Sequence, residues 1–156
     1  MCMAASFIVT KSKVLYLDWC DSHEEIIKHY ELDDSLRGGD FVRVEISPEY
    51  NDYRKPYKAW KYKTDQDETP EWYHPEEVEA AVRKMLPAWA KTHIIRKGEV
   101  AVPRHGVLSV IVLGGIAHIS GQTGGDCEAH GSATINATGQ TGGFCRAYDS
   151  ATINKS

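Results

Sequence analysis

The sequence lacks the motifs by which the common enzyme classes are recognised. Its four cysteines form neither a CxxC pair nor a cysteine–histidine cluster with the spacing of a zinc site. Its seven histidines are scattered without an HxxxH or HExxH pattern, and nothing indicates a Ser/His/Asp triad. The glycine-rich segment GQTGGD has no lysine of a phosphate-binding loop. We therefore predict a protein with no catalytic residue, no metal and no cofactor, which is not an enzyme.

The chain also lacks an excess of positive charge and a long apolar run. Its net charge of −4 argues against binding to nucleic acid, which requires a basic surface. The longest apolar run, residues 107–119, is too short to cross a bilayer and is interrupted by glycines and a histidine. The first residues, MCMAASFIVTKSK, do not have the pattern of a secretory signal. We expect a cytoplasmic protein with reduced thiols and no membrane partner.

Residues 1–98 have the alternation of short strands and helices that is typical of a small α/β domain. The predicted strands span residues 7–10, 14–18, 41–46 and 59–64, and the first two are expected to be neighbours. Ser22 and Glu25 form a capping box, which predicts the start of a helix. Pro75 predicts the start of a second helix, and Pro87 is expected to kink or interrupt it.

Residues 121–138 and 139–156 are two copies of an 18-residue repeat, GQTGGDCEAHGSATINAT and GQTGGFCRAYDSATINKS. From residue 127 to residue 138 the odd positions are small or apolar and the even positions polar, which is the alternation of a strand. The second copy repeats the inward series with Cys145, Ala147, Ala151 and Ile153, and its charged member Asp149 is expected at a corner. One repeat per coil of a β-solenoid fits this even period, because identical residues then stack on neighbouring strands. Glycine pairs at 124–125 and 142–143 are expected at corners. Cys127 and Cys145 would be stacked inward, as small core residues or as a disulfide.

The preceding residues, 103–120, have the length and the alternation of a degenerate first coil. If the phase of the repeats continues backward, the odd positions from Val107 to Ile119 face inward. The even positions Leu108, Val110 and Val112 are apolar as well, so we expect this coil to be covered on its outer side by the α/β domain. The predicted fold is therefore α+β, with a domain at 1–98 packed on a solenoid of about three coils at 99–156.

The segment DQDETPEWYH, residues 65–74, combines acids, aromatic residues and a histidine next to a predicted strand. Such a segment is typical of an interaction loop or of a weak carboxylate–histidine site. It is equally typical of a rigid turn whose carboxylates are solvated or cap the following helix. The candidate interaction residues in and beside this loop are Trp60, Asp65, Asp67, Trp72 and Tyr73.

The last coil carries the second candidate surface. Phe144, Arg146 and Tyr148 face outward in the predicted alternation, and aromatic residues with arginine are the side chains that protein interfaces favour. The repeats stop without a polar cap, so a bare strand edge is expected. We predict a homodimer through this coil, with Ile153 near the contact. Alternatively, these residues form ordinary surface, or Arg146 and Tyr148 with Lys155 hold a nucleotide.

One sequence resemblance supplies a context. The run WKYKTDQDETPEWY, the helix ending in MLPAWAKTHI and the SATI-type repeats together resemble a group of phage and prophage proteins from gut bacteria. In that group a W-x-[FY]-K-x-D-Q-D-x-x-P-x-W segment precedes repeats of varying number. The resemblance covers roughly residues 60–156. It implies a bacterial host cell but no particular mechanism.

This context, with the absence of catalytic motifs, leads to three functional hypotheses. The first is a non-enzymatic phage-encoded inhibitor of a bacterial defence effector, similar to an anti-CRISPR protein, which acts by contact with a host or phage protein. The second is a structural or oligomerisation module of a phage or prophage assembly. The third is a sponge that sequesters a defence nucleotide.

Overall fold

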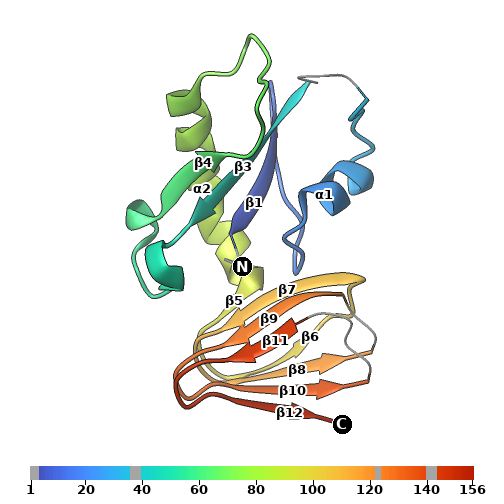
Figure 1. Ribbon diagram of the computed structural model, residues 1–156, viewed down its shortest axis with the longest axis vertical. Coiled ribbons are helices and arrows are strands. Elements are labelled where there is room, and N and C mark those ends of the chain that lie inside the picture. The colour runs from blue at the N-terminus through green and yellow to red at the C-terminus, as the bar shows by residue number, and fades with distance from the viewer. Residues whose placement is uncertain (1–3, 36–39, 122–123, 140–143) are drawn as a thin grey trace. The chain divides into compact units, whose positions relative to one another are not determined.

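The computed structural model describes residues 4–35, 40–121, 124–139 and 144–156 (Figure 1). The chain forms two compact units, one of residues 1–17 and 21–89 and the other of residues 18–20 and 90–156. The first is a small unit of helices and antiparallel strands, and the second is a β-solenoid, so the fold is α+β as predicted. Among the described residues, no helix combines the length and the apolarity needed to cross a bilayer.

The first unit is built on an antiparallel sheet with the strand order β2-β1-β3-β4. Its strands are β1 (Ala5–Thr10), β2 (Val14–Leu15), β3 (Phe41–Ser47) and β4 (Lys61–Thr64). In β3 the predicted alternation is confirmed, because Val42, Val44 and Ile46 are buried whereas Arg43 and Glu45 are only partly buried. The partners of β1 in β3 place Ser6 opposite Glu45, so polar residues meet on one face of the sheet.

Two helices accompany this sheet, α1 (His23–His29) and α2 (Pro75–His93). Ser22 caps α1, and its hydroxyl oxygen accepts a hydrogen bond from the backbone N–H of Glu25 at 3.3 Å, as the sequence predicted. Ile26 of α1 packs with Ile8 of β1 in one apolar cluster. Helix α2 continues through Pro87 without the interruption that the sequence led us to expect.

The long connection between β3 and β4 contains two short 3-10 helices, at Glu49–Asn51 and Tyr57–Ala59. It is held to α2 by Arg83, whose guanidinium donates hydrogen bonds to the carbonyl oxygens of Tyr57 and Trp60 at 3.0 and 2.8 Å. Trp60 itself is a core residue with 1% exposure, and its ring packs edge-on against Trp89.

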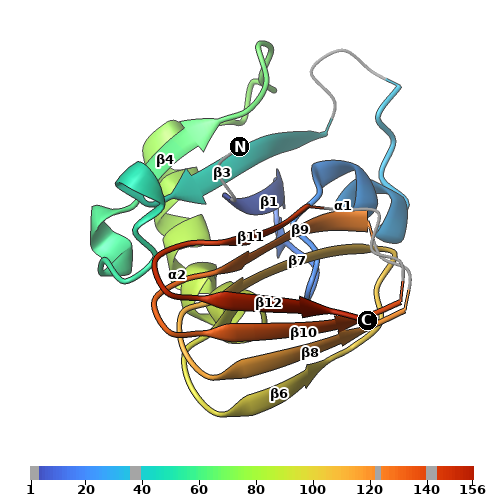
Figure 2. The ribbon, with the colours of Figure 1, turned by 60° about the horizontal axis from the view of Figure 1, so that its bottom comes forward.

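The second unit is a β-solenoid of about three turns, in which two parallel sheets face each other (Figure 2). One sheet has the order β12-β10-β8-β6 and the other β11-β9-β7-β5. The strands are β5 (Ile94–Ile95), β6 (Glu99–Val102), β7 (Val107–Val112), β8 (Ile116–Ser120), β9 (Gly124–Ala129), β10 (Thr134–Thr138), β11 (Phe144–Ala147) and β12 (Thr152–Lys155).

The stacking predicted for the two repeats is confirmed. Thr134 pairs with Thr152 and Cys127 with Cys145, each 18 positions apart, and both cysteines are free thiols. The corners stack too, because the Asp149 carboxylate accepts a hydrogen bond from the backbone N–H of Gly131 at 3.1 Å. The glycine pair at 124–125, predicted at a corner, lies instead at the start of β9, where it pairs with Val107 and Leu108 of β7. The corner predicted at 142–143 lies outside the described residues.

The phase predicted for coil 103–120 is wrong in β7. Val110 pairs with Cys127, an offset of 17 positions in place of 18, and a shift of one residue exchanges the two faces of a strand. Leu108, Val110 and Val112 are therefore the inward residues that join the solenoid core. In β8 the offset to β10 returns to 18, and Ala117 and Ile119 face inward as predicted.

The solenoid also extends further toward the N-terminus than the predicted start at residue 99. Ile94 pairs in parallel with Ile111, and β6 pairs with β8, so a layer of strands precedes the coil at 103–120. The segment Asp18–Cys20 belongs to this unit as well, because the N–H of Ser109 donates to the Trp19 carbonyl oxygen at 2.8 Å. Strand β2 consequently ends at Leu15, earlier than expected.

Candidate functional site

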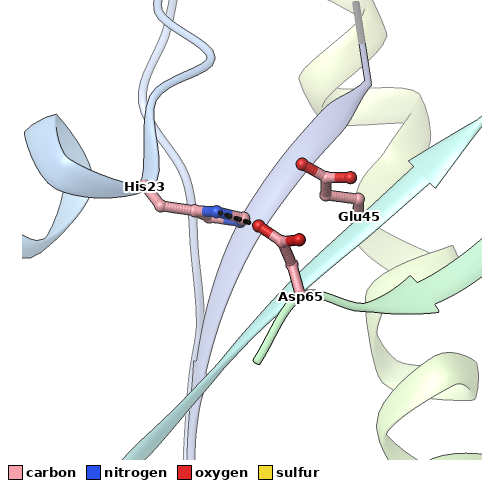
Figure 3. A group of neighbouring side chains, drawn as sticks. All are labelled: His23, Glu45 and Asp65. Atoms are coloured by element: carbon pink, nitrogen blue, oxygen red, sulfur yellow. Dashed lines mark ion pairs between the residues drawn. The ribbon is translucent and has the colours of Figure 1, made fainter. Parts of the chain in front are cut away.

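Among the described residues, one group of three metal-ligating side chains lies close together, in the first unit. His23 is the first residue of α1, Glu45 lies on β3, and Asp65 directly follows β4 (Figure 3). One ligand atom of each residue, an imidazole nitrogen or a carboxylate oxygen, lies within 4.8 Å of the other two. We call this group the His23 cluster. All three residues are partly buried.

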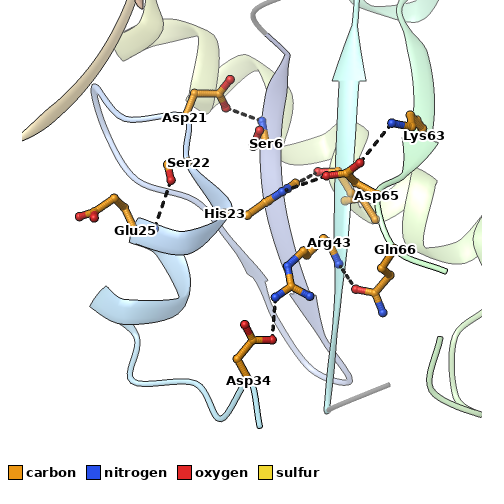
Figure 4. A network of polar contacts seen from close by, with 11 residues as sticks. Ser6, Asp21, Ser22, His23, Glu25, Asp34, Arg43, Lys63, Asp65 and Gln66 are labelled. Atoms are coloured by element: carbon orange, nitrogen blue, oxygen red, sulfur yellow. Dashed lines mark hydrogen bonds and ion pairs between the residues drawn. The ribbon is translucent and has the colours of Figure 1, made fainter. Parts of the chain in front are cut away.

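The hydrogen bonds of His23 fix which of its nitrogens carries the proton. Nε2 lies 3.1 Å from the carbonyl oxygen of Val44, which only accepts, so Nε2 is the donor. Nδ1 then faces Oδ2 of Asp65 at 3.5 Å. The other carboxylate oxygen of Asp65 accepts from the ammonium group of Lys63 at 3.1 Å (Figure 4). The imidazole and the carboxylate are thus oriented toward each other by partners on β3 and β4.

A further carboxyl group, that of Asp21, lies close to the cluster. Asp21, two residues before His23, accepts a hydrogen bond from the backbone N–H of Ser6 at 2.6 Å. Burial raises the pKa of Asp21 to about 7, the negative charge of Glu45 adds to the rise, and the hydrogen bonds from Ser6 oppose it. Among the described residues, no hydrogen bond or ion pair involves the Glu45 carboxylate.

The predicted interaction loop is largely an extension of the sheet. The N–H of Asp65 donates to the Arg43 carbonyl oxygen at 2.8 Å, and the Gln66 side chain accepts from the N–H of Arg43 at 2.7 Å. The hydroxyl of Tyr73 lies 2.5 Å from that of Thr64, which anchors the far end of the loop. Asp67 is exposed. The rigid-turn interpretation therefore accounts for most of the loop.

Of the two tryptophans proposed for this surface, the structure leaves one accessible. Trp60 is buried in the core, so it offers no surface to a partner, which corrects the expectation from its sequence position. Trp72 is partly buried and lines a depression of about 490 Å³ together with the hairpin residues Lys11 and Ser12 and with Val78 of α2. Trp72 also lines a second depression of about 490 Å³, with Leu32 and Phe41.

The candidate residues of the last coil stack on the previous coil. Arg146 pairs with Glu128 in the strand register, and the Tyr148 ring stacks on His130 with centroids 4.7 Å apart. Ile153 is half-buried. The structure describes only the backbone of Phe144, in β11. One face of the Tyr148 ring is occupied by His130, which leaves at most the other face for a nucleotide base.

Sequence reasoning named Asp65 but missed His23 and Glu45. The three residues are about 20 positions apart from one to the next, so no short motif contains them. The available signal was positional: a histidine at a capped helix start, an acid on the polar face of a strand and an acid at the end of the neighbouring strand. Comparisons of this chain with models of protein families, with curated proteins and with solved structures found no match.

Proposed function

We propose that this protein acts by binding other proteins and not by catalysis, and that the outermost coil, β11 and β12, is a docking surface. The observation that carries this proposal is a comparison of equivalent positions in the two repeats. Ile135 and Ala133 are 0% exposed, whereas their equivalents Ile153 and Ala151 are only half-buried. The same apolar series that forms the core in one coil thus reaches the surface in the next.

Backbone groups reinforce this surface. Strands β11 and β12 lie at the outer edges of the two solenoid sheets in the described chain, and an edge strand offers N–H and C=O groups for pairing. A second copy of this chain is the occupant that fits best. Support comes from the in-register parallel pairing of β10 with β12 within the chain, including the hydrogen bond from Asn154 to Asn136 at 2.8 Å, because strands of this repeat are compatible neighbours. A two-fold dimer would bring each edge strand against its own copy in antiparallel pairing, which would satisfy both edges at once.

Light scattering after size exclusion, over micromolar concentrations of the chain, tests the dimer. We expect a dimeric mass for the wild type and a monomeric mass for Ile153→Asp, which places a charge on the docking surface. Tyr50→Asp is the matched control, because Tyr50 is 91% exposed and lies in the other unit. A monomeric wild type, or a dimer that Ile153→Asp leaves intact, contradicts the assignment.

For the biological role we propose inhibition of a bacterial defence effector in the cytoplasm of the host cell. The support is the resemblance of residues 60–156 to phage and prophage proteins. Purified nuclease effectors, assayed with and without an equimolar amount of the chain, provide the test. We expect one effector to lose activity stoichiometrically, and no inhibition across CRISPR and other defence nucleases contradicts the role.

Assembly alone is the second candidate, and the exposed last coil also favours it. Deleting residues 139–156 distinguishes the two. If the protein is only an assembly module, the deletion abolishes its sole activity. If it is an inhibitor whose first unit contacts the effector, for example through Trp72, inhibition persists in the deleted chain and is lost in Trp72→Ala.

A further inference from the structure

The His23 cluster has the composition of a metal site that the proposed binding function does not use. Imidazole nitrogen with carboxylate oxygens is a ligand set for Zn²⁺, Mn²⁺ or Fe²⁺. Its three residues come from a helix start, a central strand and the end of an edge strand, so the backbone of the sheet and helix holds them in place (Figure 3).

The distance between His23 and Asp65 fits a shared ion better than a direct hydrogen bond. A charged N–H···O hydrogen bond brings its heavy atoms to about 2.7–2.9 Å, whereas Nδ1 and Oδ2 are 3.5 Å apart. Two ligands that each lie about 2.1 Å from one tetrahedral ion are separated by about 3.4 Å. Nδ1 and the carboxylate therefore already stand at the separation that a bridging cation requires.

Glu45 completes the set with a small adjustment. The three ligand atoms lie within 4.8 Å of one another, and two ligands of a single ion are at most about 4.2 Å apart. Rotation about the side-chain torsions of Glu45 covers this difference, because no described hydrogen bond or ion pair holds its carboxylate elsewhere.

His23 and Asp65 have hydrogen-bond partners of the kind that orient metal ligands in proteins. A metal-bound histidine ordinarily donates its other N–H to a carbonyl or carboxylate, and His23 does so to Val44 at 3.1 Å. A ligating carboxylate is ordinarily hydrogen-bonded through its other oxygen, as Asp65 is to Lys63. The Asp65 side chain is 37% exposed, so solvent reaches its carboxylate.

We propose that His23, Glu45 and Asp65 bind one divalent transition-metal ion, with Zn²⁺ or Mn²⁺ as the fitting species. The ion ties the start of α1 to β3 and to the end of β4. Three protein ligands leave at least one coordination position for water or for a donor atom from a partner.

Calorimetric titration of the tag-free, chelator-treated full chain with ZnCl₂ and with MnCl₂ tests the site. We expect saturable binding of one ion per chain for at least one metal, and at least a tenfold loss of affinity in His23→Gln and in Asp65→Asn. His29→Gln and Glu68→Gln are matched controls, because both residues are exposed and lie on the same helix and the same loop. Both should bind within twofold of the wild type.

A second readout keeps the test decisive if a variant folds poorly. Co²⁺ bound to nitrogen and oxygen ligands in a tetrahedral site gives visible absorption bands, and Glu45→Gln, a change of nearly equal volume, should weaken or remove them. Circular dichroism without metal confirms that each variant is folded. Absence of one-to-one binding of both metals by the wild type, or equal binding by the folded His23 and Asp65 variants, overturns the proposal.

Discussion

Gly125 gives the most exacting prediction about the solenoid. Its backbone φ angle is +99°, in the left-handed region that residues other than glycine rarely adopt. A Cβ added there would lie 1.9 Å from the carbonyl oxygen of Leu108, on the paired strand β7. Cβ contacts below 3.0 Å are essentially never found, so the strands must separate by about 1.1 Å in Gly125→Ala.

The expected cost follows from two contributions. The left-handed backbone costs an alanine roughly 1–2 kcal/mol, and loss of the adjacent buried strand hydrogen bonds costs about 1–3 kcal/mol more. Gly125→Ala should therefore destabilise the protein by about 2–5 kcal/mol. Gly98→Ala is the control, because Gly98 has φ +80° in the same unit but an added Cβ meets nothing within 4 Å. It should show only the backbone contribution, roughly 1–2 kcal/mol.

Urea unfolding followed by far-ultraviolet circular dichroism measures both free energies. The solenoid contributes two of the three described sheets, so its unfolding dominates the β-strand signal. If Gly125→Ala is no less stable than Gly98→Ala, the close approach of β7 and β9 at this position is wrong.

Three further predictions concern packing and reactivity. Ile135→Ala should lower the free energy of unfolding in urea by about 3 kcal/mol, because Ile135 is fully buried. Ile153→Ala, measured on the monomer, should lower it by about half as much, because Ile153 is only half-buried. Arg83→Met should lower the free energy of unfolding by about 1–3 kcal/mol, because two carbonyl oxygens lose their hydrogen-bond donor. Lys84→Met should leave the free energy of unfolding nearly unchanged, because Lys84 is exposed. A hydrogen bond with Cys145 raises the pKa of the Cys127 thiol, and burial raises it further. Iodoacetamide should therefore alkylate Cys127 at least tenfold more slowly than a free cysteine. Mass spectrometry of timed samples measures this rate.

The repeated part of the sequence predicted structure best where only one register was compatible with the residues. From residue 127 to residue 138 the even positions are polar and the odd positions small or apolar, so a slip of one residue would bury Thr134 and Asn136 in the core. The structure has the predicted pairing there. In β7 both faces are apolar, so Val110 and Ile111 fit the core equally well by sequence, and the alternation carries no information on phase.

The His23 cluster escaped prediction for a different reason. Alternation along β3 places Glu45 on the polar face, and the capping box places His23 at a helix start, but neither pattern specifies the distance between them. That distance depends on β1, which pairs with β3 on one edge and whose Ser6 N–H donates to the Asp21 carboxylate. The contact connects the residues before α1 to the sheet, and it joins positions 15 apart in sequence.

The two proposed sites lie in different units, and this separation makes their tests independent. The His23 cluster lies wholly within residues 21–89, and the docking surface lies wholly within residues 90–156. A metal that ties α1 to the sheet should raise the unfolding temperature of the first unit and leave the dimer mass unchanged. Conversely, Ile153→Asp should dissociate the dimer without altering metal affinity. A metal-dependent dimer would instead require that a partner's atom fill the open coordination position, which places the cluster itself in the interface.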